Sequence, residues 1–173
     1  MRQMNEKEQH RVFDEWLERH RGLLFKVVHS YAFSTHDKED LFQEVATQVW
    51  RSIPTFNGDS KVSTWLYRVA IFSAITWSRR ESRHRHGREA LDEVEDVPQG
   101  PGLRPGDRVS WLYDQIRRLD PIERSLMLLL LEGFTYEEMA GVLGISESNV
   151  GVKVHRIKKR LASRARKEET DGV

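Results

Sequence analysis

The segment from Thr135 to Leu161 separates apolar and basic side chains in the way that a DNA-reading helix requires. One stripe of apolar residues recurs at helical spacing: Val150, Val154, Ile157 and Leu161. The opposite face carries side chains that can donate to phosphates and to base edges. These donors are Asn149, Lys153, His155, Arg156, Lys158 and Lys159. The spacing therefore predicts the recognition helix of a helix-turn-helix, with most base contacts near its N-terminus.

The residues before this helix suit the turn that such a motif needs. Gly144 stands where the turn requires a positive φ, which glycine adopts without steric cost. Ser146 can cap the second helix, and Thr135-Tyr-Glu-Glu138 has the pattern of a capping box for the first. The alternative is a basic amphipathic helix on a small helical domain. Spacing, turn glycine, caps and charge together favour DNA binding.

The elements that must position this motif are also helical. Apolar spacing predicts helices over Val12–Tyr31, Asp37–Ile53 and Val62–Arg80, and Pro54 ends the second of them. Farther along, Asp120-Pro-Ile-Glu123 predicts a capped helix start before a run of leucines. The sequence shows no strand pattern of period two and no internal repeat. The predicted fold class is therefore all-α.

The helical pattern stops between Gly87 and Asp107, where proline and glycine cluster after an acidic run. This composition is typical of a flexible linker, which at about 20 residues could extend to roughly 65 Å. The sequence therefore predicts two small helical domains, the second containing the helix-turn-helix. Their expected bounds are 1–87 for the first domain, 88–108 for the linker, and 109–173 for the second domain with its basic C-terminal tail.

Composition excludes several classes of protein. The 173 residues carry a net charge of only +1, but Gly151–Lys167 and Arg79–Arg88 are basic whereas Glu89–Asp96 is acidic. The absence of cysteine excludes a disulfide scaffold and a thiolate zinc site. No apolar run has membrane-spanning length, and the N-terminus lacks the apolar core of a signal peptide. The expected location is the cytoplasm.

No pattern of catalytic residues accompanies these features. The sequence has no glycine-rich phosphate loop, no HExxH motif and no paired-carboxylate site with a partner base. His84-Arg-His86 lacks the carboxylate or thiolate partners of a typical metal site. We therefore expect no enzymatic activity, no cofactor, no metal and no small-molecule substrate.

Two sets of motifs follow one another along the chain. The first set is Asp40-Leu-Phe-Gln-Glu-Val45, Trp50, Phe56-Asn-Gly-Asp-Ser60 and Thr64-Trp-Leu-Tyr-Arg-Val-Ala70. The second set is Leu119-Asp-Pro121 and Phe134-Thr-Tyr-Glu-Glu-Met-Ala-Gly-Val-Leu-Gly-Ile145. Each motif alone is modest, but the ordered set resembles the extracytoplasmic-function (ECF) sigma factors of the sigma-70 family over nearly the whole chain. The resemblance implies a factor that binds core RNA polymerase, recognises −35 and −10 promoter elements and promotes DNA melting.

The resemblance also implies a docking face for the polymerase. In this family the Asp-Leu-x-Gln-Glu helix binds the clamp helices of the β′ subunit, and the β subunit is a further expected contact. The matching residues are Asp40, Leu41, Gln43, Glu44, Thr47 and Gln48. An ordinary solvated acidic helix is the alternative interpretation of this face.

In this family the −10 element is read and opened by the turn and helix that follow Phe56. The implied −10 contacts are Asn57, Gly58, Asp59, Ser60, Lys61, Ser63, Trp65, Tyr67, Arg68, Ile71 and Phe72. A polar loop beside an aromatic-bearing helix can hydrogen-bond and stack an unpaired base. Trp65 and Tyr67 cannot both face inward, because they are two residues apart on a helix. Phe72 stands where many family members carry Asn, so the −10 preference is expected to shift.

The −35 element is implied to be read by the recognition helix. The expected contacts are Ser146, Ser148, Asn149, Gly151, Val152, Lys153, His155 and Arg156. Gly151 and Val152 depart from the more usual basic and serine residues, so fewer direct base contacts are expected there. Lys153 and Arg156 are the strongest candidates for contacting DNA.

Partners follow from the resemblance as well. Family members are commonly held inactive by an anti-sigma factor, and we expect one here, membrane-anchored, which would hold the chain at the inner membrane face. The main alternative is a helix-turn-helix transcriptional regulator that acts without being a polymerase subunit. That alternative explains the second domain but leaves Asp40–Ala70 unexplained.

Overall fold

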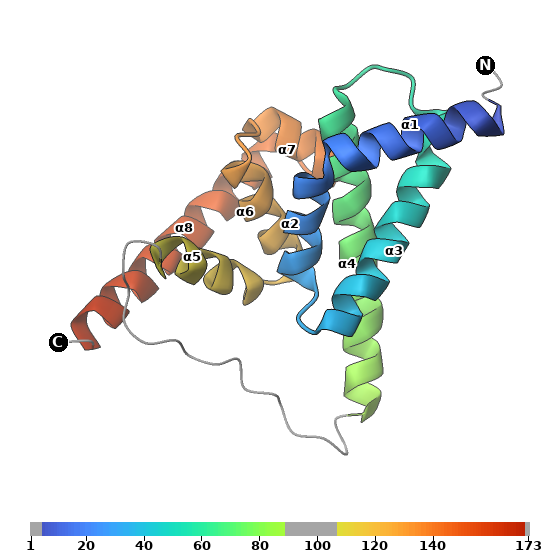
Figure 1. Ribbon diagram of the computed structural model, residues 1–173. Coiled ribbons are helices and arrows are strands. Elements are labelled where there is room, and N and C mark those ends of the chain that lie inside the picture. The colour runs from blue at the N-terminus through green and yellow to red at the C-terminus, as the bar shows by residue number, and fades with distance from the viewer. Residues whose placement is uncertain (1–4, 89–106, 172–173) are drawn as a thin grey trace. The chain divides into compact units, whose positions relative to one another are not determined.

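The computed structural model describes residues 5–88 and 107–171, and every regular element in these two ranges is a helix (Figure 1). The all-α prediction is confirmed. The chain divides into two compact units, Met1–Ser82 and Arg83–Val173. Residues 89–106 of the predicted linker lie outside the described residues.

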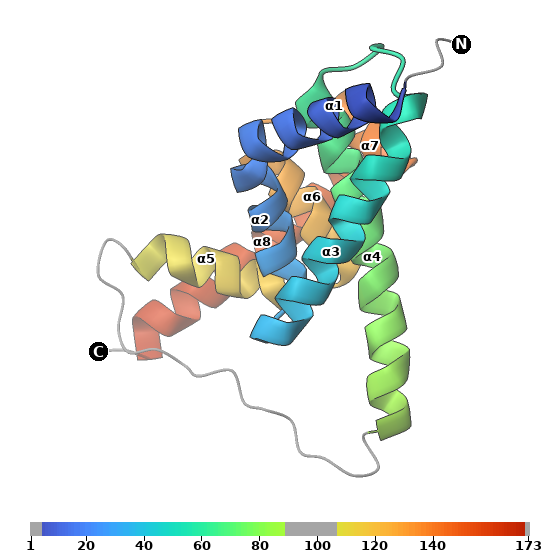
Figure 2. The same ribbon diagram turned by 45° about the vertical axis from the view of Figure 1, so that its right-hand side comes forward.

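The first unit is a helical bundle in which α1, α2 and α3 pack against one another. Its helices are α1 (Glu6–Arg19), α2 (Arg21–Tyr31), α3 (Thr35–Ser52), the short 3-10 helix η1 (Ile53–Thr55) and most of α4 (Val62–Arg88), which continues past Ser82. Figures 1 and 2 show α3 and α4 side by side. Fully buried side chains from three of these helices form the core: Leu24, Val27, Leu41, Val45, Val49 and Leu66.

The helix predicted over Val12–Tyr31 is interrupted at His20, which the apolar spacing did not reveal. The backbone of His20 leaves the helical region at φ −112° and ψ 17°. Its N–H donates to Trp16 O at 3.0 Å to close α1, and its carbonyl accepts from Leu24 N at 3.2 Å to open α2. Burial, followed by the charge of Arg19, lowers the pKa of His20, which favours the neutral imidazole at this bend.

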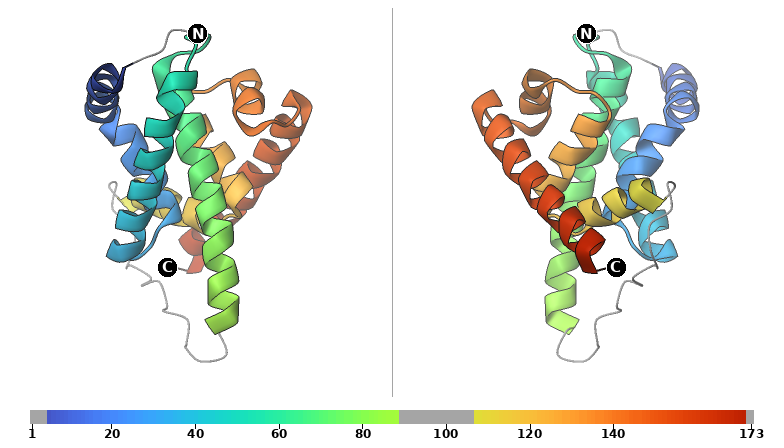
Figure 3. Two further views of the ribbon diagram at one scale, coloured as in Figure 1. Left: turned by 90° about the vertical axis from the view of Figure 1, so that its right-hand side faces the viewer. Right: turned by 90° about the vertical axis from the view of Figure 1, so that its left-hand side faces the viewer.

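The second unit contains α5 (Asp107–Arg117), α6 (Pro121–Leu131), α7 (Tyr136–Leu143) and α8 (Glu147–Asp171). The predicted cap of α6 is present, because Asp120 Oδ1 accepts from Ile122 N at 2.9 Å and Glu123 N at 3.0 Å. α8 packs against α6 and α7. It is one unbroken helix (Figure 3).

The turn between α7 and α8 has the geometry of a helix-turn-helix. The capping box of α7 is complete, since Thr135 Oγ1 accepts from Glu138 N and Thr135 N donates to Glu138 Oε2. Gly144 ends α7 in the left-handed region at φ 67° and ψ 32°. Ser146 Oγ then accepts from Asn149 N at 3.2 Å and caps α8. The predicted apolar stripe of α8 is buried: Val150, Val154, Ile157 and Leu161.

We expect opposite effects from alanine at two glycines of α7. Gly144→Ala places a Cβ at positive φ and should lower the free energy of unfolding by about 1–2 kcal/mol. Gly141 is exposed inside the helix, and a Cβ added there would meet open space. Gly141→Ala should therefore raise the free energy of unfolding by up to about 1 kcal/mol. Urea unfolding followed by circular dichroism measures both. Equal effects of the two substitutions would contradict the assigned turn.

Candidate nucleic-acid and partner interfaces

The first turns of α8 present the side chains predicted to read DNA. Ser146, Ser148, Asn149, Val152, His155 and Arg156 are exposed, and Lys153 is half-buried at the flank. The side chain of Val152 is 46% exposed although it is apolar, so it is available to a thymine methyl group. Because the buried stripe fixes the rotation of α8, this face is the one that must point away from the unit.

Gly151 differs from its neighbours on α8 because it lies against α7. A Cβ at this position would be 3.6 and 3.7 Å from two ring carbons of Tyr136. These are ordinary van der Waals distances, so alanine fits, whereas a long basic side chain would have to pass the ring. The glycine therefore places Tyr136 beside the start of the recognition helix, which the sequence did not predict.

In the first unit, α3 presents the predicted polymerase-binding residues along one polar face. Asp40, Gln43 and Thr47 are exposed, and Glu44 and Gln48 are half-buried. Gln48 Nε2 donates to Glu44 Oε1 at 3.0 Å, and His36 Nε2 lies 3.3 Å from Asp40 Oδ2. Leu41 is completely buried, so it anchors α3 and does not present its side chain to a partner.

The predicted −10 loop is polar, exposed and locally ordered. Gly58 has a φ of 82°, which permits the tight turn before α4. The Asn57 side-chain amide donates to Asp59 Oδ2, and Asp59 N donates back to Asn57 Oδ1 at 3.3 Å. The carboxylate of Asp59 is thereby held within the loop. Ser60 and Lys61 are exposed beside it.

An open groove of about 530 Å³ lies between α3 and α4 and joins two sets of residues that the sequence assigned to different partners. Glu44 and Gln48 line it from α3, and Trp65, Arg68 and Phe72 line it from α4. The Phe72 side chain is 44% exposed. Ser63 is half-buried at the start of α4, and Tyr67 and Ile71 lie on the side of α4 that does not line the groove.

Trp65 forms a wall of this groove and is fixed by contacts that the sequence did not predict. Its Nε1 donates to Ser52 Oγ at 3.1 Å. Its ring is 5.5 Å from that of Phe56, which in turn is 5.2 Å from that of Trp16 in an edge-to-face arrangement. Helical spacing from Trp65 through Val69, Phe72 and Thr76 would have indicated the α4 side of the groove. No local signal points to Ser52, 13 residues earlier.

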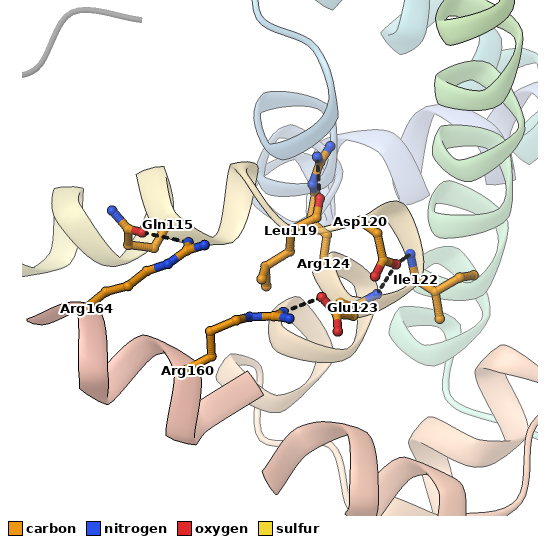
Figure 4. A network of polar contacts seen from close by, with 8 residues as sticks. All are labelled: Gln115, Leu119, Asp120, Ile122, Glu123, Arg124, Arg160 and Arg164. Carbon is orange, nitrogen blue, oxygen red and sulfur yellow. Dashed lines mark hydrogen bonds and ion pairs between the residues drawn. The ribbon is translucent and has the colours of Figure 1, made fainter. Parts of the chain in front are cut away.

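Polar contacts tie the later turns of α8 to α5 and α6 (Figure 4). Arg160 Nη2 contacts Glu123 Oε2, and Arg164 Nη1 donates to Gln115 Oε1 at 3.1 Å. Arg124 Nη2 donates to the carbonyls of Arg117 and Leu119 at the end of α5, at 2.6 and 2.8 Å. These contacts hold α5, α6 and α8 together away from the recognition residues.

Neither a metal site nor a membrane span occurs in the described ranges. Residues 5–88 and 107–171 contain no group of three His, Cys, Asp or Glu side chains able to hold an ion. Within the same ranges, no helix is both long and apolar enough to cross a bilayer.

Both units match regions of one protein family. Sigma-70 region 2 matches residues 16–84, and sigma-70 region 4 matches residues 110–161, together well over half of the chain. The ECF RNA polymerase sigma-E factor of Haemophilus influenzae is 26% identical over 155 residues, which cover 83% of this chain and 79% of that protein. RNA polymerase sigma factor YlaC of Bacillus subtilis is 27% identical over 157 residues, covering 84% and 91%.

Solved structures share the fold. The sigma factor RpoE of Bartonella quintana, in complex with the anti-sigma factor NepR, matches with a TM-score of 0.69 at 21% identity, covering 87% of this chain and 94% of that one. CnrH, in complex with the cytosolic domain of CnrY, matches with a TM-score of 0.63 at 20% identity, covering 92% and 90%.

The fold and these faces define a two-part, DNA-binding transcription factor, in which a helix-turn-helix is joined to a second helical unit. Sigma-70 regions 2 and 4 occur in it in that order. The chain belongs to the sigma-70 family, and within it to the ECF sigma factors.

The Ser52–Trp65 contact should contribute measurably to the first unit. Ser52→Ala removes the acceptor of a half-buried indole N–H and should lower the free energy of unfolding by about 1 kcal/mol. Thr76→Ala, an exposed position on the same groove, should change it by no more than about 0.5 kcal/mol. Urea titration with separate fits for the two units checks this, and indistinguishable effects would show that the contact is not formed.

Proposed function

We propose that this chain is a detachable specificity subunit of RNA polymerase, whose first unit docks on the core enzyme and reads the −10 element while the second reads the −35 element. The observation that carries the proposal is that sigma-70 regions 2 and 4 fall on separate units, each with an exposed polar or basic face. A helix-turn-helix regulator acting without the polymerase would leave the match over residues 16–84 without a purpose.

Docking on the polymerase is assigned to the polar face of α3. Asp40, Gln43 and Thr47 offer exposed donors and acceptors to the β′ clamp helices, with Glu44 and Gln48 beside them. The buried Leu41 keeps these side chains in one orientation. The β subunit is a further proposed contact, without assigned residues.

The −10 element is assigned to the loop 57–61 and to the groove side of α4. Arg68 is exposed and can neutralise a phosphate, while Trp65 and Phe72 offer ring surface to an unstacked base. The groove volume of about 530 Å³ exceeds what one base needs. Tyr67 and Ile71 lie beside this surface, and we assign them to support of α4 and not to direct base contact.

The −35 element is assigned to the first turns of α8. Arg156 can bind a guanine edge and Asn149 an adenine edge, while Val152 can pack on a thymine methyl. Two elements about 17 base pairs apart are separated by roughly 58 Å. A chain of about 20 residues, which is the length expected for the linker from the sequence, spans up to roughly 65 Å, so it would allow both helical regions to reach one promoter.

Regulation is proposed from the relatives. RpoE and CnrH are both solved in complex with a partner, which is named an anti-sigma factor in the RpoE complex. We propose that this chain also has an anti-sigma partner, membrane-anchored, which masks its exposed faces in the cytoplasm. The protein itself is assigned no catalytic residues, since its role is to position DNA and polymerase.

The experiment that tests this function is transcription in vitro with purified core polymerase, this chain and a library of genomic promoter fragments. We expect specific start sites that appear only when the chain is added and that share two sequence elements. If the chain shifts fragments by itself and no new starts appear, it is a regulator and the proposal is wrong.

Substitutions on the polar face of α3 test whether this face binds core polymerase. The double substitution Gln43→Ala with Glu44→Ala should weaken binding to core polymerase roughly tenfold or more, because it removes two polar side chains at the proposed contact. Glu18→Ala, an exposed carboxylate on α1, is the control and should bind normally. Fluorescence anisotropy of labelled chain with core polymerase gives both affinities. Equal losses in both variants would place the docking face elsewhere.

A further inference from the structure

The exposed face of α8 continues well beyond the residues assigned to the −35 element. Arg156, Lys159, Ser163 and Arg166 follow one another at spacings of three, four and three residues, which places them on one side of a helix. All four are exposed or lie at the edge of that face. From Gly151 to Lys167 the chain contains no carboxylate side chain. We call this row, from Lys159 to Arg166, the distal stripe.

The distal stripe is held in fixed register with the recognition residues. Leu161 is 6% exposed and continues the buried stripe of α8. Arg160 contacts Glu123 of α6, and Arg164 donates to Gln115 of α5, so two polar contacts restrain this part of the helix (Figure 4). α8 is unbroken between the two sets of residues. An exposed face restrained in this way is preorganised for a ligand.

The stripe has a shape that suits a phosphate ridge. Lys159 and Arg166 are seven residues apart, which corresponds to about 10.5 Å along the helix. Between them, Ser163 is small, and its hydroxyl bonds back to the Lys159 carbonyl at 3.0 Å. Two long cationic side chains therefore lie on either side of a short one on the helix surface.

We propose that the distal stripe binds the sugar-phosphate backbone of duplex DNA that borders the −35 element. The inference rests on the proposed function, because α8 must lie in the major groove for the stripe to face DNA. A major groove is about 12 Å wide, and Arg166 lies about 15 Å beyond Arg156 along α8. Lys159 then reaches the rim of the groove, and Arg166 reaches the backbone past it. These contacts supply affinity and orientation without sequence preference.

Exposed cations outside α8 provide a matched control. Lys7 on α1 and Arg118, directly after α5, are both exposed and belong neither to the distal stripe nor to the recognition residues. The experiment measures binding of polymerase carrying the full chain to one promoter fragment across a range of salt concentrations. The stripe variant is Lys159→Gln with Arg166→Gln. The control is Arg118→Gln with Lys7→Gln, which removes one arginine and one lysine from exposed positions outside α8.

The stripe variant should reduce the slope of log K against log salt by about 0.9 for each phosphate that it no longer neutralises. Raising the salt from 50 to 200 mM should therefore weaken DNA binding of the unsubstituted chain roughly tenfold more than it weakens DNA binding of the stripe variant. The control should keep the original slope, and start sites should be unchanged in both. The loss of affinity caused by the stripe substitutions should be the same on promoters with different −35 sequences, because backbone contacts carry no sequence information.

Equal slopes in the stripe variant and the control would overturn the inference. The inference would also be wrong if the stripe variant kept the original slope of log K against log salt but changed the RNA length at which the chain dissociates. The stripe would then bind the transcript. Failure of the proposed function looks different. In that case no polymerase-dependent start sites would be found with any form of the chain.

Discussion

The packing of α8 beneath α6 and α7 determines which of its side chains can meet DNA. Val150, Val154 and Ile157 are fully buried, and each contributes about 1.5–3 kcal/mol relative to an exposed side chain. Rotation of α8 would expose this stripe and bury charged residues in its place. The direction of Asn149 and Arg156 is therefore a consequence of the core. Gly144 completes the constraint, because its left-handed backbone lets α7 end and α8 begin within a few residues.

The same constraint acts on α3 and α4 in the first unit, where it brings two expected functions together. Leu41, Val45 and Val49 are buried, which turns Gln43 and Thr47 outward and leaves Glu44 and Gln48 at the edge of α3. α4 places Trp65, Arg68 and Phe72 across from that edge. The proposed polymerase face and the proposed −10 surface thus share a groove. Docking of the polymerase on α3 would therefore alter the surroundings of the proposed −10 surface on α4.

Local rules predicted much of this arrangement from sequence. Caps at Asp120, Thr135 and Ser146 and the turn at Gly144 all depend on residues within four positions of each other, so their chemistry is visible in the chain. The bend at His20 was missed because apolar spacing continues through it.

Contacts between distant segments were not predictable in this way. Glu123 and Arg160 are 37 residues apart, and Gln115 and Arg164 are 49 apart, so their meeting depends on how α5, α6 and α8 pack. The groove also required the spacing of α3 and α4, which no sequence pattern supplies. Which of the predicted residues touch polymerase or promoter stays a prediction, although the structure shows which of them are exposed.

In the proposed function, the chain and the polymerase together open promoter DNA. Permanganate reactivity of unpaired thymines at one promoter measures this directly, with core polymerase alone, the chain alone and both. The account predicts reactive thymines near position −10 only when both are present. Reactive thymines with core polymerase alone at equal strength, or protection of the site by the chain without polymerase, would contradict it.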